Sequence, residues 1–184
     1  AKAFLRKAGT IILATSIVLW LLLNLPPRSA EVAELDPAAA SAYVVEHSFA
    51  AQLGQLIEPL FAPLGFDWRI CVGLIGAMAA REVFVATIGQ IFAATDPESP
   101  SSAVQSAVYT AGPHQGEVLF TAPTTVALLV FFAYALLCMS TVATIRRETN
   151  SWKWPLVAWV YTFTLAWGAA FLARHVTLDR KSVV

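Results

Sequence analysis

The stretch that decides the fold is WRICVGLIGAMAAREVFVATIGQIFAA, which runs from Trp68 to Ala94. It is mostly apolar and long enough to cross a bilayer, yet Arg81 and Glu82 stand near its middle. A charge at the bilayer centre costs about 2.5–3.5 kcal/mol on insertion scales, so such residues face protein, water or a counter-charge. The stretch therefore predicts a polar functional centre within the membrane. The alternative is a charged pair at the end of a shorter helix, close to the interface.

The composition of the whole chain is that of an integral membrane protein. Of its 184 residues, 58% are hydrophobic and 13% are charged, whereas a soluble domain carries about 25% charged residues. The formal net charge is zero, so no basic surface indicates a nucleic-acid partner. Cys71 and Cys138 lie far apart in apolar stretches, a pattern that indicates neither a disulfide framework nor a structural zinc site.

The apolar segments predict an all-α fold, a polytopic transmembrane helical bundle that forms a single membrane domain over residues 1–184. The predicted spans are about 8–27, 68–94, 121–145 and 154–173, separated by loops that include 28–47 and 95–117. Residues 48–64 are too short and too polar to span, and Pro59 and Pro63 interrupt them. This segment is predicted to be a short amphipathic helix, either interfacial or a re-entrant half-helix.

The topology of the 68–94 stretch stays open. The basic residues before the first span place the N-terminus on the cytoplasmic side. If 68–94 crosses fully, the loop at 146–153 lies outside and the basic tail inside; if it is re-entrant, the two are exchanged. Basic residues occur at both places, so charge does not decide, and we favour a full crossing because the stretch is long enough.

Two long segments resemble one known family. They are IEPLFAPLGFDWRICVGLIGAMAAREVFVATIGQIF at Ile57–Phe92 and CMSTVATIRRETNSWKWPL at Cys138–Leu156. Together they are similar to the C-terminal membrane region of the ferrous iron transport protein B (FeoB) family, its second Gate segment and the cysteine-containing helix that follows. The resemblance runs from about Ala1 to about Arg174. In many members a Pro or Gln precedes the helix cysteine, whereas Leu137 does so here.

The resemblance implies a fragment of a ferrous iron permease, multi-pass in the cytoplasmic (inner) membrane of a bacterium, with Fe(II) as the transported ion. Full-length members also carry an N-terminal GTP-binding domain and a first Gate region. This sequence contains no GxxxxGK[ST] motif, so we expect no GTP hydrolysis by the chain itself and no enzyme activity. The expected partners are those two regions, membrane lipid and, in a homo-oligomer, a second copy of the chain.

The candidate metal ligands follow from the chemistry of Fe(II), which accepts thiolate, imidazole and carboxylate ligands. Cys138 is the leading candidate, followed by the soft donor Met139, the carboxylate Glu82 and Met78, one turn before Glu82. Three of them have an alternative: both Cys138 and Met78 can serve as packing, and Glu82 can pair with an arginine. Structural or helix-anchoring roles are expected for Arg81, Arg146 and Arg147. Cys71 is expected to pack among its small neighbours.

The sequence leaves two other functions open. A Gate-type transporter of an organic solute, such as a nucleoside, predicts aromatic and amide side chains near the polar centre. A non-transporting membrane assembly subunit predicts that Glu82 and Cys138 tolerate substitution. No nucleophile and base stand together in the spans, so a membrane enzyme is disfavoured.

Overall fold

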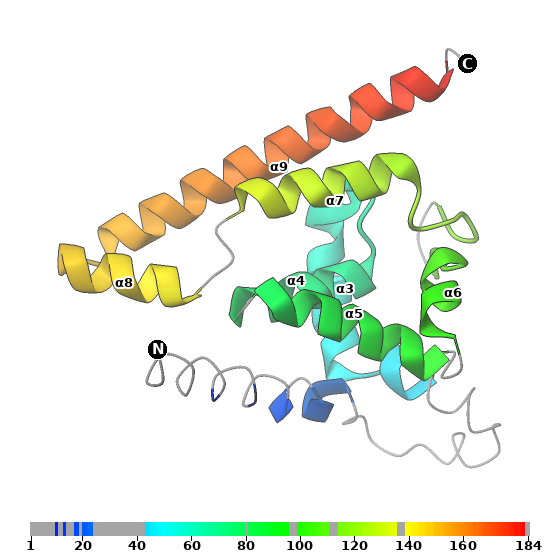
Figure 1. The fold of residues 1–184 in the computed structure, drawn as a ribbon, viewed down its shortest axis with the longest axis horizontal. Helices are drawn as coiled ribbons and strands as arrows, with labels where there is room; N and C mark the ends of the chain where they lie inside the picture. Colours follow the sequence, from blue (N-terminus) through cyan, green and yellow to red (C-terminus); the bar gives the residue numbers. More distant parts are fainter. Residues whose placement is uncertain are drawn as a thin grey trace.

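The regular secondary structure among the described residues is helical (Figure 1), apart from one isolated bridge between Val108 and Val118, which confirms the predicted fold class. The computed structural model describes residues 10, 13, 17, 18, 20–23, 43–79, 81–95, 99–110, 114–135 and 139–182. The helices are α3 (Phe49–Phe61), η2 (Ala62–Leu64), α4 (Trp68–Ala79), α5 (Arg81–Thr95), α6 (Pro100–Gln105), α7 (Ala122–Tyr134), α8 (Met139–Thr149) and α9 (Lys153–Ser182). Most of the predicted span 8–27 and of the loop 28–47 lies outside the described residues.

The predicted short helix at 48–64 is present as α3 followed by η2. Ser48 caps α3, because its hydroxyl accepts the backbone N–H of Ala51 at 3.1 Å. The chain then turns through Gly65, whose φ of +79° suits glycine, and Asp67 caps α4 by accepting the N–H of Ile70 at 3.0 Å. The axes of the helical segments on either side of this turn differ by 104°.

The stretch from 68 to 94 is two helices that fold back on each other, where the sequence favoured a single span. The guanidinium carbon of Arg69 lies 5.4 Å from the ring centre of Phe92. In one straight helix these residues would stand about 35 Å apart. Gly73 explains the return, because a Cβ there would lie 2.8 Å from the Phe84 ring, so glycine lets α5 lie against α4. The number of bilayer crossings stays a prediction.

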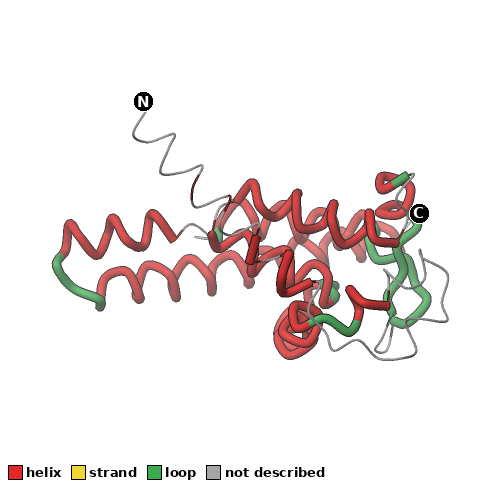
Figure 2. Tube along the Cα trace, turned by 90° about the horizontal axis from the view of Figure 1, so that it is seen from below, coloured by secondary structure: helices red, strands yellow, loops and turns green. Residues whose placement is uncertain are grey.

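The predicted span 121–145 is also divided, into α7 and α8, with residues 136–138 outside the described part. Helix α9 begins beside α8 and then runs antiparallel along α7 (Figures 1 and 2). At 30 residues it is longer than the predicted span 154–173. Among the described helices, Lys153–Asp179 is long and apolar enough to cross a membrane by itself, and the bent α3–α4 pair reaches that standard together.

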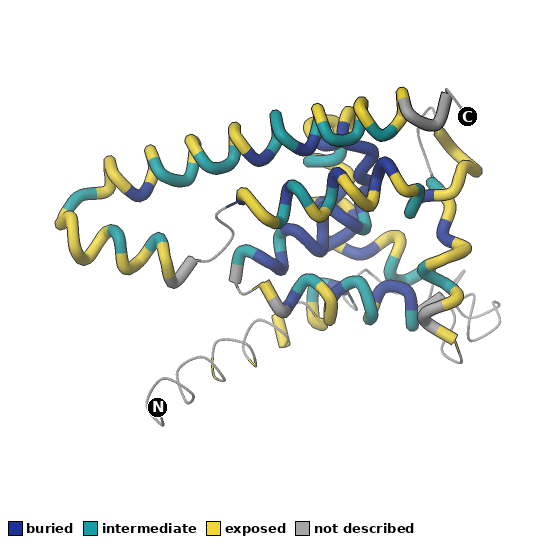
Figure 3. Tube along the Cα trace, turned by 45° about the horizontal axis from the view of Figure 1, so that its top comes forward, coloured by how far each residue is buried: buried dark blue, intermediate teal, exposed yellow. Residues whose placement is uncertain are grey.

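The core lies where α3, α4 and α7 meet, while α8 and the outer side of α9 stay exposed (Figure 3). Aromatic rings fill its centre: Phe61 stacks with Phe66, and both meet Phe131 edge-on at 5.6 and 6.1 Å. Phe163 of α9 closes the group from the other side, 5.9 Å from Phe131. Burying these rings fixes the bend between α3 and α4 against the α7–α9 pair.

Candidate functional site

The tip of the α4–α5 hairpin meets the end of α7. The Nη2 of Arg81, the first residue of α5, donates a hydrogen bond to the carbonyl oxygen of Ala135 at 2.9 Å. Ala135 is the C-cap of α7. Close by, the rings of Phe84 and Phe132 meet edge-on with centres 4.6 Å apart. Two interruptions of the helices, one between α4 and α5 and the other after α7, therefore lie next to each other.

The contact explains why an arginine occurs in this apolar stretch. The last four carbonyls of a helix have no partner within the helix, and the C-terminal end carries partial negative charge. A guanidinium satisfies both needs of α7, since it is cationic and donates up to five hydrogen bonds. The structural role expected of Arg81 therefore has a specific partner, the carbonyl of Ala135.

Three of the four candidate iron ligands are close to this junction in the sequence: Glu82 comes directly after Arg81, and Cys138 and Met139 come three and four residues after Ala135. Glu82 follows Arg81 in the first turn of α5, and Met139 begins α8. The side chains of both residues, and the whole of Cys138, lie outside the described part of the structure. Among the described residues, no group of three or more His, Cys, Asp or Glu side chains is arranged to hold a metal ion.

The remaining candidates lie away from the junction or inside the core. Met78 is half-buried against the larger core cluster, a placement that favours its packing alternative. Cys71 is buried in that cluster, as its packing interpretation predicted. Arg146 and Arg147 lie in the last turn of α8, and the guanidinium carbon of Arg146 is 4.0 Å from the ring centre of Trp152.

At the opposite end of the hairpin, which we call its mouth, the start of α4 is held by polar contacts that sequence reasoning missed. Arg69 pairs with Asp67, the Nε and Oδ2 being 3.5 Å apart, with side chains 11% and 2% exposed. Trp68 donates from its indole N–H to the Thr110 hydroxyl at 3.0 Å. The sequence signal that could have revealed this site was the Asp-Trp-Arg run at the start of α4.

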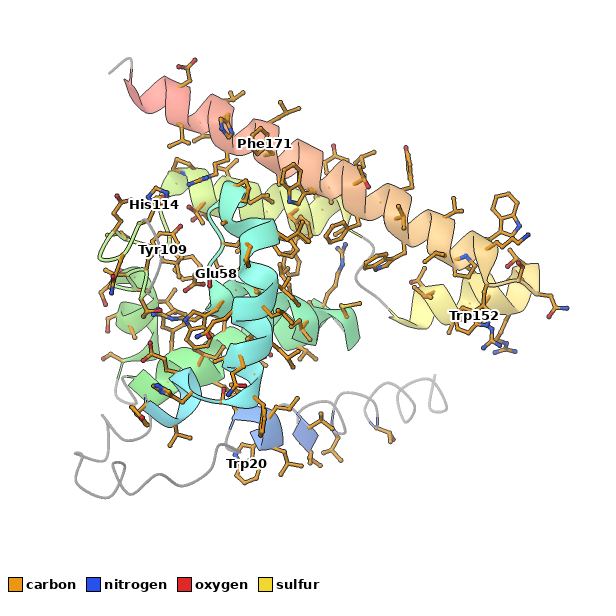
Figure 4. All side chains as sticks on the ribbon, turned by 180° about the vertical axis from the view of Figure 1, so that it is seen from behind. Trp20, Glu58, Tyr109, His114, Trp152 and Phe171 are labelled. Atoms are coloured by element: carbon orange, nitrogen blue, oxygen red, sulfur yellow. The ribbon has the colours of Figure 1, made fainter. Side chains whose placement is uncertain are left out.

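The turn between α3 and α4, which lies beside the mouth, accepts further hydrogen bonds from segments distant in the sequence. The Tyr109 hydroxyl donates to the carbonyl of Gly65 at 2.7 Å, and burial raises the pKa of this tyrosine. From α9, Arg174 donates to the carbonyl of Pro63 at 2.7 Å and Trp167 to that of Leu60 at 3.0 Å. Figure 4 shows Tyr109 and His114 at this end of the molecule and Trp152 at the other.

A cavity of about 320 Å³ opens at the mouth. Its walls include Trp68 and Arg69 from α4, Phe92 from α5, and Thr110 from the loop after α6. The exposed Glu46 also lines the cavity, so this residue borders both the cavity and the solvent. The cavity combines aromatic rings with one cation, one anion and a hydroxyl.

Comparison with known proteins gives one family and several relatives. The family described as "Gate: Nucleoside recognition" matches residues 5–152. The Fe(2+) transporter FeoB of Leptospira interrogans is 37% identical over 176 residues, covering 95% of this chain and 25% of the relative. FeoB of Campylobacter jejuni is 30% identical over 177 residues, with 96% and 27% covered.

A fused relative matches in the same way. The Fe(2+) transport protein A/Fe(2+) transporter FeoB fusion protein of Porphyromonas gingivalis is 31% identical over 201 residues, covering 96% of this chain and 24% of the relative. The chain thus spans about a quarter of the length of these relatives. No solved structure matches. The homology and the apolar helices together indicate a membrane protein.

Proposed function

Because this chain belongs to the Gate family and corresponds to the Gate region of FeoB transporters, we propose that it forms part of a path for Fe(II) across the membrane. The observation that carries the proposal is the hydrogen bond from Arg81 to Ala135, which joins the two helix interruptions. Non-helical backbone within a membrane is tolerated where it is buried in protein or lines a cavity, and transporters build substrate sites from discontinuous helices near the midplane.

The lengths of the helices support a site near the membrane centre. Helix α5 has 15 residues and α7 has 13, which gives them lengths of about 22 and 20 Å. Both are shorter than the hydrocarbon core, which is about 30 Å thick. A hairpin that enters from one face would therefore end inside the membrane, near the interruption after α7.

The chemistry of the junction segments suits a ferrous ion as cargo. Glu82 would supply a carboxylate, Cys138 a thiol that coordinates as thiolate, and Met139 a weak thioether. Few and weak ligands are appropriate, because a transport site must release its ion as well as bind it. Met78 is the least favoured member of the set, since it packs against the core.

The experiment is Fe(II) uptake by the full-length protein in a bacterium lacking its own ferrous transporter. Cys138→Ser and Glu82→Gln should each reduce the initial uptake rate at least tenfold while membrane levels of the protein stay normal. Cys71→Ala is the matched control, because that cysteine is buried in the core and should leave uptake near normal. Normal uptake and metal selectivity in both test variants would eliminate the iron-path proposal.

The setting of this path is also proposed. We place the chain in the cytoplasmic membrane of a bacterium as a multi-pass protein, together with a GTP-binding domain, the first Gate region and, in a homo-oligomer, a second copy. The return of the α4–α5 hairpin favours the re-entrant alternative, in which the loop at 146–153 is cytoplasmic. Labelling of intact cells with an impermeant maleimide tests this assignment: a cysteine introduced at Gln115 should react from outside and one at Lys153 should be protected, whereas a full crossing of 68–94 would give the reverse.

The cavity at the mouth favours a second candidate, transport of an organic solute such as a nucleoside. Trp68 and Phe92 line it although both are largely buried, and Arg69, Glu46 and Thr110 offer polar contacts, in a volume typical of small-molecule sites. Uptake of labelled nucleosides by the same cells separates the candidates. Nucleoside uptake that is lost in Phe92→Ala, with Fe(II) uptake unaffected by Cys138→Ser, would support the second function and reject the first.

A further inference from the structure

The turn between α8 and α9 forms a cationic and aromatic surface far from the hairpin. We call residues 146–154 the α8–α9 turn. It contains three cations, Arg146, Arg147 and Lys153, against one carboxylate, Glu148, and all four residues are exposed. This charge pattern complements a negatively charged partner.

The aromatic side chains of the turn are also uncovered. Trp152 is 62% exposed and Trp154 is 61% exposed. The Arg146 guanidinium lies over the Trp152 ring at 4.0 Å, so its charge is held against one face of an indole. Tryptophan concentrates at membrane interfaces, where its ring lies at the level of the lipid headgroups.

The backbone of the turn is ordered by its own hydrogen bonds. The Thr149 hydroxyl donates to the carbonyl of Ile145 at 2.7 Å, and Asn150 adopts a left-handed conformation with φ of +48°. The Ser151 hydroxyl accepts the N–H of Lys153 at 3.2 Å and so caps the start of α9. The cations and indoles are therefore presented from a defined turn.

Helix α9 indicates what surrounds this surface. In the apolar span Lys153–Asp179, only 11% of the residues are buried within the protein. Large apolar side chains that include Leu156, Val157 and Val160 are exposed directly after the turn. The 27 residues of this span extend about 40 Å, whereas the hydrocarbon core is about 30 Å thick. If α9 crosses the bilayer, its first residues reach the headgroups.

We propose that the α8–α9 turn binds the phosphate groups of anionic phospholipids, with Arg146, Arg147 and Lys153 as the cationic contacts and the two indoles at the boundary with the acyl chains. The other partner that such charge could suit is an acidic face of a soluble domain. The exposed apolar surface that continues from the turn along α9 favours lipid. The proposal does not depend on which solute the protein transports.

The test titrates short-chain phosphatidylglycerol into the full-length protein in a neutral detergent and follows the thermal unfolding midpoint, with phosphatidylcholine and inorganic phosphate as separate probes. Each basic residue near an anionic surface contributes about fivefold in affinity, so the triple variant Arg146→Gln, Arg147→Gln, Lys153→Gln should lose about a hundredfold. Phosphatidylcholine should give no comparable stabilisation. An equal response to inorganic phosphate would show a phosphate site rather than a lipid site, and would overturn the assignment.

Matched variants separate charge and aromatic packing from general damage. Arg180→Gln with Lys181→Gln, at the other end of α9, should keep the phosphatidylglycerol response, and so should Arg146→Lys with Arg147→Lys. Cys138→Ser should also respond as the unmodified protein does, whatever its uptake rate. An unchanged response in the triple glutamine variant, or binding of a purified soluble domain that is lost in that variant while the lipid response remains, would refute the proposal.

Discussion

The mouth and the tip of the α4–α5 hairpin are held by different means. At the mouth, the Asp67–Arg69 pair and the Trp68–Thr110 hydrogen bond fix the start of α4, beside a turn that Tyr109 and Arg174 also bind. At the tip, the described contacts include the single hydrogen bond from Arg81 to Ala135 and one aromatic pair. The difference indicates a firmly built support at one end and, at the other, a junction of interrupted helices, the arrangement in which a transient binding site can be built.

The largest expected effect on stability is at the mouth, for Asp67→Ala. The substitution removes the cap of α4 and leaves the largely buried Arg69 without its carboxylate, and breaking a buried pair costs about 3–5 kcal/mol. Unfolding of the purified protein in detergent measures it. Asp67→Asn keeps a cap and should lose less; equal midpoints for the unmodified protein and Asp67→Ala would contradict the view that the mouth is the support.

A pair of glycine substitutions should have opposite effects. A Cβ on Gly54 would lie 2.5 Å from the carbonyl oxygen of Trp68, so Gly54→Ala must push α3 away from α4 and should cost about 1–3 kcal/mol. Gly89 has open space around it, so Gly89→Ala should gain about 0.5–1 kcal/mol from the lower entropy of the unfolded chain. A midpoint for Gly54→Ala that is equal to or above that of the unmodified protein would show that the α3–α4 contact is not close packed.

The hydroxyl of Tyr109 should contribute less, about 0.5–1.5 kcal/mol for its hydrogen bond to Gly65. Because burial raises the pKa of Tyr109, folding favours the neutral phenol. This contribution is complete below the pKa of the unfolded tyrosine, about 10, and is lost as pH rises through the higher pKa of the folded state. Unfolding midpoints measured from pH 8 to pH 11 should therefore fall less in Tyr109→Phe than in the unmodified protein.

The control for the tyrosine prediction is Tyr161→Phe, since Tyr161 is 65% exposed on α9. That substitution should leave both the midpoint and its dependence on pH unchanged. An identical alkaline loss of stability in Tyr109→Phe and in the unmodified protein would assign the titration to other groups.

The smallest stability change, about 0.5 kcal/mol, is expected at the tip for Arg81→Gln, because Arg81 is an exposed residue whose cation lies at the C-terminal end of a helix. Fe(II) uptake should nevertheless fall several-fold, since the two interruptions would no longer be joined. Arg81→Lys should restore part of the uptake by keeping a cationic donor. A large loss of stability with uptake unchanged would instead show that the tip stabilises the fold and has no role in transport.

The sequence predicted the helical class, the short helix at 48–64 and the packing role of Cys71, because prolines and apolar composition act over a few neighbouring residues. It also identified Arg81 as a residue that needs a partner. It did not reveal the Tyr109, Trp167 and Arg174 hydrogen bonds, since each joins the turn at Leu60–Gly65 to a segment distant in the chain. The iron-ligand roles of Cys138, Glu82, Met139 and Met78 stay predictions.

By itself, the sequence determined that this chain is a largely apolar helical protein with charges set inside one apolar stretch. Only the tertiary structure decided that this stretch turns back on itself and that Arg81 closes the end of α7. The physical reason is that hydropathy measures how much apolar length a segment has, whereas its path depends on side-chain packing. Gly73 accepts the ring of Phe84 from a helix that local sequence could equally have continued straight.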